Sequence, residues 1–472
     1  MNSRICKSKC LCSSNCLSHQ KNQVTSNESV HGSDLAVQYL STCNVCVEQN
    51  QVCKCDLQTT NVNDDHHHGN QAANCSFTHA VINMIGMLIG LGQLSTPYAL
   101  QSGGWISAFL SVGLGMVCAY SSHLLGKCLD KNPKARSYSD IGQHAFGRKG
   151  RVLTTTFIYI EIFMALVSYT ISLHDNIIRV FFGTHLTLAW AKFSTSQLLT
   201  VIAVLIALPS LWLRDLSSIS LLSFGGILMS IIIFSTVACT AIFGVVKANH
   251  RIPALNLHNI PSISGLYIFG YTGHIVFPDL YKAMKDPSKF TRVSIVSFTI
   301  VTLLYTLLAF MGAKLFGPEV NPQITLSMPP HLIVTKIALW ATVLTPMTKY
   351  ALEFAPFAIQ LENNLLPQSM SSRTKMIIRG SVGSILLLII LILALSVPYF
   401  EHVLGLTGSL VSTGVCLILP CVFYIKIYWG QIPKPILILN LIFIAFGSFL
   451  GVFGTISSSK SLIKKFMKAH SA

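Results

Sequence analysis

Two glycine-containing stretches could bind a ligand through main-chain atoms. "GLG" at Gly90 to Gly92 and "GYTG" at Gly270 to Gly273 each lie inside an apolar segment. Glycine permits backbone conformations that break a helix, and a broken helix exposes N–H and C=O groups. A helix that restarts after the first break would favour a carboxylate at its N-terminus, while carbonyls at the second break would accept from an ammonium group. The residues expected to bind such a zwitterion are Gly90, Leu91, Gly92, Gly270, Tyr271, Thr272 and Gly273.

The pairing of the two interruptions favours a binding site over simple packing. Small residues also allow helices to approach closely in a membrane, which is the alternative interpretation of each stretch alone. The two interruptions fall in the first and sixth apolar segments, which correspond if five segments form a repeat. Paired glycine- or proline-interrupted segments at corresponding positions are typical of transporters that bind substrate at mid-membrane.

Several polar residues inside apolar segments could take part in ion coupling. Ionisable groups within spans are often functional, although each also has a structural interpretation. Glu161 could carry a proton or hydrogen-bond a neighbouring broken helix, and His274 could titrate or satisfy a freed carbonyl. The candidates for ion coupling are Asn83, Glu161, His274, Thr345 and Thr348. Lys349 and Glu353 share a helix face and are interpreted as a structural ion pair.

The elements that must position these residues are membrane-spanning helices. The chain has 472 residues, of which 51% are hydrophobic and 11% charged, with a mean hydropathy of +0.58. Soluble domains contain roughly 25% charged residues. The sequence therefore predicts an all-α, polytopic membrane protein. Eleven spans are expected, at residues 77–100, 104–128, 152–182, 196–213, 219–246, 264–284, 293–316, 332–358, 377–397, 403–424 and 436–458.

Residues outside the spans define the domain boundaries and the orientation. Residues 1–75 are polar and lack apolar periodicity, which predicts a disordered cytosolic tail before a membrane domain at 76–458 and a short basic tail at 459–472. With the N-terminus in the cytosol, the cytosolic connectors hold fifteen Lys and Arg residues and the opposite connectors hold three. This asymmetry satisfies the positive-inside rule, and it makes anionic lipid a better partner than nucleic acid for the net charge of +16.

The cysteine-rich tail leaves two alternatives open. Nine of the fourteen cysteines lie within the first 75 residues, and His66, His67 and His68 follow most of them. A small zinc knot is one interpretation, although the spacing fits no standard zinc module. Free or lipidated thiols in a reducing cytosol are the favoured alternative. We therefore expect no metal and no cofactor.

Five blocks in order resemble one known family. They include "AVINMIGMLIGLGQLSTPYALQSGGW", "GYTGHIVFPDLYKAMKDPSKF" and "TPMTKYALEFAP". Together they resemble the amino acid/auxin permease family, and within it the plant vacuolar amino acid transporter group, kin of the vesicular inhibitory amino acid carriers. The resemblance covers roughly residues 75–458. Gln93 departs from the more usual small or apolar residue at the first break, which leaves the substrate range open.

The resemblance implies a LeuT-like fold with two inverted five-helix repeats and an eleventh helix. It also implies proton-coupled transport of neutral amino acids by alternating access, usually at a vacuolar or other endomembrane. In relatives the unwound part of span one contacts substrate, which here matches Gly90, Leu91, Gly92 and the nearby Ser95. An asparagine that matches Asn83 serves ion coupling in relatives, and a hydroxyl that matches Thr345, or alternatively Thr348, lies near their ion site. The sequence contains no P-loop pattern, so an ATP-driven enzyme is not expected. The alternatives are a membrane amino-acid sensor and a carrier of another small organic acid such as auxin.

Overall fold

Membrane-spanning helices make up the described part of the chain. A computed structural model describes residues 75–183, 194–207, 216–243, 246, 250–365 and 370–470. The tail before residue 75, with its candidate zinc ligands, lies outside these residues. Within them, the one β-type pairing is an isolated bridge between Cys75 and Met284. The prediction of an all-α membrane protein is confirmed.

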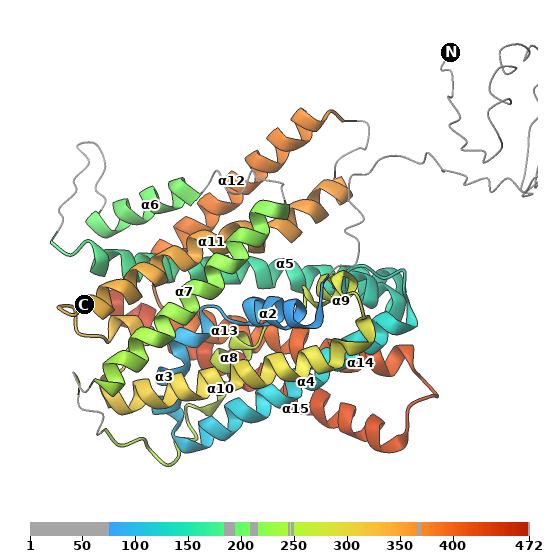
Figure 1. The fold of residues 1–472 in the computed structure, drawn as a ribbon, viewed down its shortest axis with the longest axis horizontal. Helices are drawn as coiled ribbons and strands as arrows, with labels where there is room; N and C mark the ends of the chain where they lie inside the picture. The colour runs from blue at the N-terminus through green and yellow to red at the C-terminus, as the bar shows by residue number, and fades with distance from the viewer. Residues whose placement is uncertain are drawn as a thin grey trace, which may run out of the picture. The chain divides into compact units, whose positions relative to one another are not determined.

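Helices occupy all eleven expected segments (Figure 1). The first half consists of α2 (Phe77–Leu88), α3 (Gly92–Gly103), α4 (Trp105–Lys131), α5 (Tyr138–Val180), α6 (Thr195–Ala207) and α7 (Leu216–Ile242). The second half consists of α8 (Ile260–Gly270), α9 (Phe277–Ala283), α10 (Phe290–Phe316), α11 (Ile333–Leu365), α12 (Ser372–Ser396), α13 (Phe400–Thr407), α14 (Leu419–Ile427) and α15 (Lys434–His470). Short helical turns complete it: η2 (Pro287–Lys289), η3 (Gly317–Glu319), η4 (Ile324–Leu326) and the π-helical η5 (Gly408–Ser412) and η6 (Gly414–Ile418).

Length and apolar composition identify most of these helices as spans. In the described ranges, seven helices are long and apolar enough to cross a membrane, or eight when α2 and α3 count as one bent span. Two further apolar helices, α6 and α8, are shorter. Only 17% of the most apolar window of α15 is buried within the protein, and its exposed side chains include Leu441, Phe449 and Phe453. Such a surface suits hydrocarbon, because apolar patches of this size are rare on soluble monomers.

Two helix ends differ from the expected boundaries. Helix α5 starts at Tyr138, not near residue 152, and bends at Phe146 and Gly147, where Gly147 has a positive φ of 62°. A capping box between Ser137 and Asp140 stabilises this early start. Helix α15 continues through the basic segment after residue 459, where Lys465 contacts Glu401 at the start of α13.

The short broken helices lie among the long ones. Helix α11 packs along α7 and α5, and α12 packs along α5, on one side of the molecule (Figure 1). Helix α10 packs along α4, α3 and α2, while α15 packs along α8 and α13. The packing brings α3 directly against α8, although more than 150 residues separate them in the sequence. The site is therefore built where the first and sixth spans meet.

Candidate functional site

Both predicted interruptions are present in the structure. Helix α2 ends at Leu88 and α3 begins at Gly92, and the two axes differ by 61°. Helix α8 ends at Gly270 and α9 begins only at Phe277, so six residues separate the two halves of the sixth span. Ile89 adopts an extended backbone conformation with ψ of 121°, which ends the first helix. Main-chain groups are thus released from helical pairing inside both spans.

The two interruptions touch each other through glycine. A Cβ atom built on Gly92 would lie 2.3 Å from the Cα of Gly270, far inside van der Waals contact. A side chain at Gly92 would therefore push the broken helices apart. The close-packing role and the helix-breaking role, which the sequence left as alternatives, both apply at this pair.

Tyr305 of α10 ties the two broken helices together. Its hydroxyl lies 3.0 Å from the carbonyl oxygen of Leu88 and 3.0 Å from that of Gly270. A hydroxyl has one proton to donate, so these two carbonyls share it. Both are terminal carbonyls of a half-helix, and such groups need partners from outside the helix. Tyr305 supplies one partner to both breaks, and the sequence analysis did not identify it.

The start of α3 is buried and lacks a side-chain cap. Leu91 stands at its N-cap position without a side-chain hydrogen bond to the helix. Leu91, Gln93 and Ser95 are each 1% exposed. The Ser95 hydroxyl donates to the Gly92 carbonyl at 3.0 Å, whereas the Gln93 Oε1 atom has no hydrogen-bond partner among the described residues. The Gln93 and Leu94 N–H groups already donate to the Gly90 and Leu91 carbonyls, which leaves the Gly92 N–H group and the spare amide oxygen to bind a small zwitterion.

The second break carries one histidine with a free ring nitrogen. His274 is fully buried, and its Nε2 atom lies 2.9 Å from the Ser121 hydroxyl and 3.2 Å from the Cys118 carbonyl on α4. A carbonyl only accepts, so the contact with Cys118 requires the proton on Nε2. The Nδ1 atom then accepts, and within the described ranges nothing donates to it. His274 joins the break to α4.

Tyr271, Thr272 and Gly273 of the second break contact residues of several other helices. The Tyr271 ring lies 5.6 Å from the ring of Tyr305, and its hydroxyl lies 3.4 Å from that of Ser111. Thr272 donates to the Ile268 carbonyl and is approached by the thiol of Cys416 at 3.6 Å. A Cβ on Gly273 would meet the Leu88 side chain at 3.2 Å, so the two interruptions also meet there.

The other candidates for ion coupling form hydrogen bonds with groups outside the two breaks. Glu161 on α5 accepts from the Ser412 hydroxyl at 2.7 Å, and its second oxygen has no partner in the part of the chain that the structure describes. Thr345 and Thr348 donate to carbonyls of their own helix α11, at 2.8 Å each. Asn83 is exposed, and its amide lies 3.8 Å from the Cys75 sulfur. The eight substrate candidates and His274 thus belong to the two breaks, whereas these hydrogen bonds of Asn83, Glu161 and the two threonines go to other groups.

Lys349 contacts the first broken helix from α11. It is 6% exposed, and its ammonium group lies 3.2 Å from the Gly86 carbonyl in the last turn of α2. The sequence analysis singled it out only as a partner of Glu353, because helical spacing shows which side chains share a face and not which helix they reach.

Hydrogen bonds close the protein at both ends of the broken helices. At one end Cys75 pairs through its backbone with Ala283 and Lys285, which joins the start of α2 to the end of α9. At the other end the loop between α10 and α11 inserts Gln323, which is 1% exposed. The Gln323 side chain bonds Asp175, Asn176 and Ser172 of α5, each at 2.7 Å. Both sets of hydrogen bonds join segments that lie more than 100 residues apart in the sequence.

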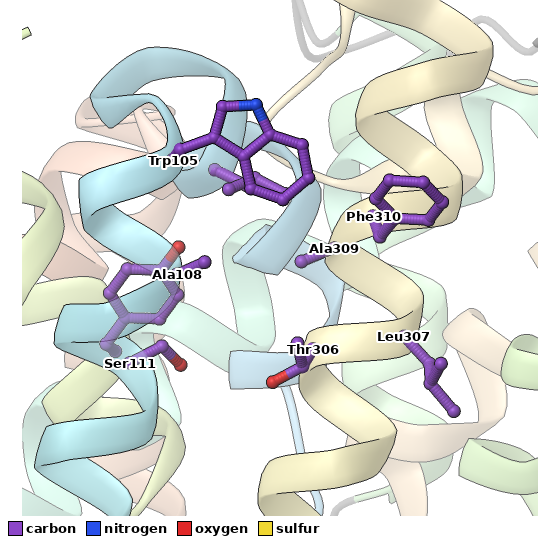
Figure 2. A pocket seen from close by; sticks show the side chains of 9 residues that line it. Trp105, Ala108, Ser111, Thr306, Leu307, Ala309 and Phe310 are labelled. Atoms are coloured by element: carbon purple, nitrogen blue, oxygen red, sulfur yellow. The ribbon is translucent and has the colours of Figure 1, made fainter. Parts of the chain in front are cut away.

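A separate cavity lies between α4 and α10 beside the site (Figure 2). Its volume is about 180 Å³, and its lining is almost entirely apolar. Trp105 and Ala108 project from α4, while Leu307, Ala309 and Phe310 project from α10. A zwitterion needs partners for two charges, which this lining does not supply. This cavity therefore lacks the groups that would bind both ends of a zwitterion.

Several known proteins are similar to this chain in sequence. Residues 73–459 match the family described as transmembrane amino acid transporter protein. The chain is 59% identical to the Arabidopsis thaliana amino acid transporter AVT1H over 440 residues, which cover 91% of this chain and 99% of the relative. It is 38% identical to the Arabidopsis amino acid transporter AVT1E over 82% of this chain and 74% of that one. It is 27% identical to the vesicular GABA transporter of Caenorhabditis elegans, over 81% of this chain and 79% of that one.

Two solved structures are similar at low sequence identity. The crystal structure of MhsT in complex with L-phenylalanine aligns with a TM-score of 0.49 at 12% identity, over 83% of this chain and 98% of that one. The inward-facing conformation of Mhp1 aligns with a TM-score of 0.45 at 14% identity, over 84% of this chain and 91% of that one.

Proposed function

Because this chain belongs to the transmembrane amino acid transporter family, we propose that it carries neutral amino acids by proton-coupled alternating access. The observation that supports this proposal is the contact between the two interrupted helices at Gly92 and Gly270. Around this contact lie a helix start without a side-chain cap, released carbonyls and two polar atoms, on Gln93 and His274, that have no hydrogen-bond partner in the described part of the chain.

The polarity of the two breaks suits the two ends of an amino acid. The carboxylate would bind the N–H groups at Gly92 and the start of α3, where the helix dipole is positive. The ammonium group would bind carbonyls between Gly270 and Gly273, in competition with the Tyr305 hydroxyl. A neutral side chain fits best, because the eight residues at the two breaks are uncharged, and the nearby ionisable groups, His274 and Lys349, have partners on other helices at Cys118 and Gly86. Gly90, Leu91, Ser95, Tyr271 and Thr272 complete the proposed site.

Transport would proceed by opening one sealed end at a time. The Cys75 pairing and the Gln323 network are both made of hydrogen bonds, which exchange readily for bonds with water. Rocking of one group of helices against another would break one seal while keeping the other, as in transporters with paired broken helices. Inverted five-helix repeats of the LeuT-like type are the arrangement that we infer for this motion.

The cellular setting follows from charge and from relatives. We infer a cytosolic N-terminus, because basic residues concentrate in the connectors on that side. In this arrangement residues 1–75 form a cytosolic tail, 76–458 the transporter domain and 459–472 a basic C-terminal stretch. A vacuolar or other endomembrane location is the setting that the resemblance to plant vacuolar carriers favours.

Flux in proteoliposomes tests the proposal. Purified protein would be reconstituted, and uptake of radiolabelled L-leucine, L-alanine and GABA measured with a pH gradient of either sign. We expect accumulation of at least one of these amino acids that reverses with the gradient. Binding without flux would instead indicate an amino-acid sensor, and flux indifferent to the gradient would refute proton coupling.

A further inference from the structure

A buried lysine connects the long helix α11 to the first half of the broken span. The Lys349 Nζ atom donates to the Gly86 carbonyl oxygen at 3.2 Å, and the side chain is 6% exposed. Gly86 lies two residues before the end of α2 at Leu88. The last carbonyls of a helix carry a partial negative charge and lack helical partners, so they attract a cation.

The strength of this contact depends on the charge of Lys349. A hydrogen bond from an ionised donor is about twice as strong as a neutral one. A buried ammonium group is costly, so the carbonyl that α2 presents helps to stabilise the protonated form. Loss of the proton would leave a neutral amine and a weaker bond. The position of α2 against α11 is thus linked to one proton.

The surroundings of Lys349 contain few other charges. Glu353, one turn further along α11, interacts electrostatically with Lys349. It also interacts electrostatically with Glu161 and Tyr169 of α5. Helix α7 presents Gly226, where an added Cβ would lie 3.5 Å from the Lys349 Cε atom. Arg379 lies on α12, which packs against α5 and α11, and it is also buried. From α2 itself, the Gly86 carbonyl is the polar contact.

We propose that Lys349 carries the coupling proton, fastening α2 to α11 when it is protonated and releasing α2 when it is not. This inference rests on the proposed proton-coupled transport. In each cycle one proton would bind the Lys349 amine from the proton-rich side and leave to the other side after α2 has moved. Among the candidates described above, Glu161 bonds Ser412 and His274 bonds α4, whereas Lys349 bonds half-helix α2 directly.

Two substitutions separate a proton carrier from a structural cation. Lys349→Arg keeps a cation and a donor for the Gly86 carbonyl, but arginine does not release its proton in proteins. Lys349→Gln keeps a donor without any charge to gain or lose. Lys336 lies on the exposed face of the same helix, so Lys336→Arg and Lys336→Gln are matched controls.

The readout is accumulation driven by a pH gradient. Full-length variants would be purified, checked by gel filtration and reconstituted, with valinomycin and equal potassium holding the membrane potential at zero. The probe is whichever of leucine, alanine and GABA the wild-type protein accumulates best. A gradient of two pH units limits one-proton coupling to about 100-fold accumulation, because each pH unit is a factor of ten.

The expected result distinguishes the inference from the proposed function. Wild type and both Lys336 variants should accumulate the probe against its concentration gradient. In both Lys349 variants the ratio of internal to external probe concentration should not rise above one. Lys349→Gln should still exchange internal for external amino acid without a gradient, which a merely misfolded protein would not do. Gradient-driven accumulation at the wild-type level by either Lys349 variant would overturn the inference. Wild-type protein without gradient-driven accumulation would instead refute proton coupling.

Discussion

Replacing Gly92 with alanine should impair transport through one close contact. The added Cβ would lie 2.3 Å from the Cα of Gly270, about 1 Å short of the 3.4 Å at which ordinary contact begins. The opposing atom is backbone, so it cannot rotate away as a flexible side chain would. The two interruptions must therefore separate, and the carbonyls of Leu88 and Gly270 can no longer share Tyr305.

The size of the effect follows from overpacking. Inserting a methyl group into a well-packed interior typically costs about 1–3 kcal/mol. If this strain falls mainly on the closed state, turnover should fall between about fivefold and 150-fold, since 1.4 kcal/mol corresponds to a factor of ten. Larger residues at Gly92 should abolish uptake.

The assay compares Gly92→Ala with a glycine that has room. A Cβ on Gly113 of α4 would meet no atom within 4 Å. Gly113→Ala should therefore keep wild-type uptake, and helix propensity would add up to about 1 kcal/mol of stability. Initial uptake rates in proteoliposomes and gel-filtration profiles would be measured for both variants. Equal uptake by the two would refute the argument that Gly92 and Gly270 must touch for transport.

Three further substitutions or deletions test separate parts of the structure. Tyr305→Phe removes the hydroxyl shared by two half-helix carbonyls and should destabilise the protein by about 1–3 kcal/mol, seen as a lower thermal midpoint in detergent; an unchanged midpoint would mean that other groups satisfy those carbonyls. Glu161→Gln keeps an acceptor for Ser412 and should leave the pH profile of uptake unchanged, whereas a shifted profile would give Glu161 the coupling role assigned to Lys349. Deleting residues 1–70 should preserve flux in proteoliposomes, and loss of flux in a folded protein would assign the tail a part in transport.

The amino-acid sequence was sufficient for the class of protein and for its interruptions. Apolar segments long enough to span hydrocarbon predict helices, because only an internally hydrogen-bonded backbone is stable there. Glycines within such segments then indicate breaks, and both breaks occur where the glycines lie. The motifs also identified the family, because five blocks in a fixed order constrain the choice strongly.

The sequence was less informative about helix ends outside the membrane. The early start of α5 depends on the Ser137–Asp140 capping box, which has no apolar signature. The extension of α15 to His470 is accompanied by the contact of Lys465 with Glu401, 64 residues earlier. Hydropathy predicts which segments form helices within the hydrocarbon of the membrane. It does not predict how far a helix continues through polar residues outside the membrane.

Only the tertiary structure decided which of these residues meet. Gly92 and Gly270 are in contact across 178 positions of sequence, and Tyr305 and Lys349 both reach the C-terminal end of α2 from two other helices. Asn83, Glu161, Thr345 and Thr348, which looked equally polar in the sequence, form hydrogen bonds with other groups. The physical reason is that helical periodicity determines which side chains share a face, while the packing of one helix against another determines what each face touches.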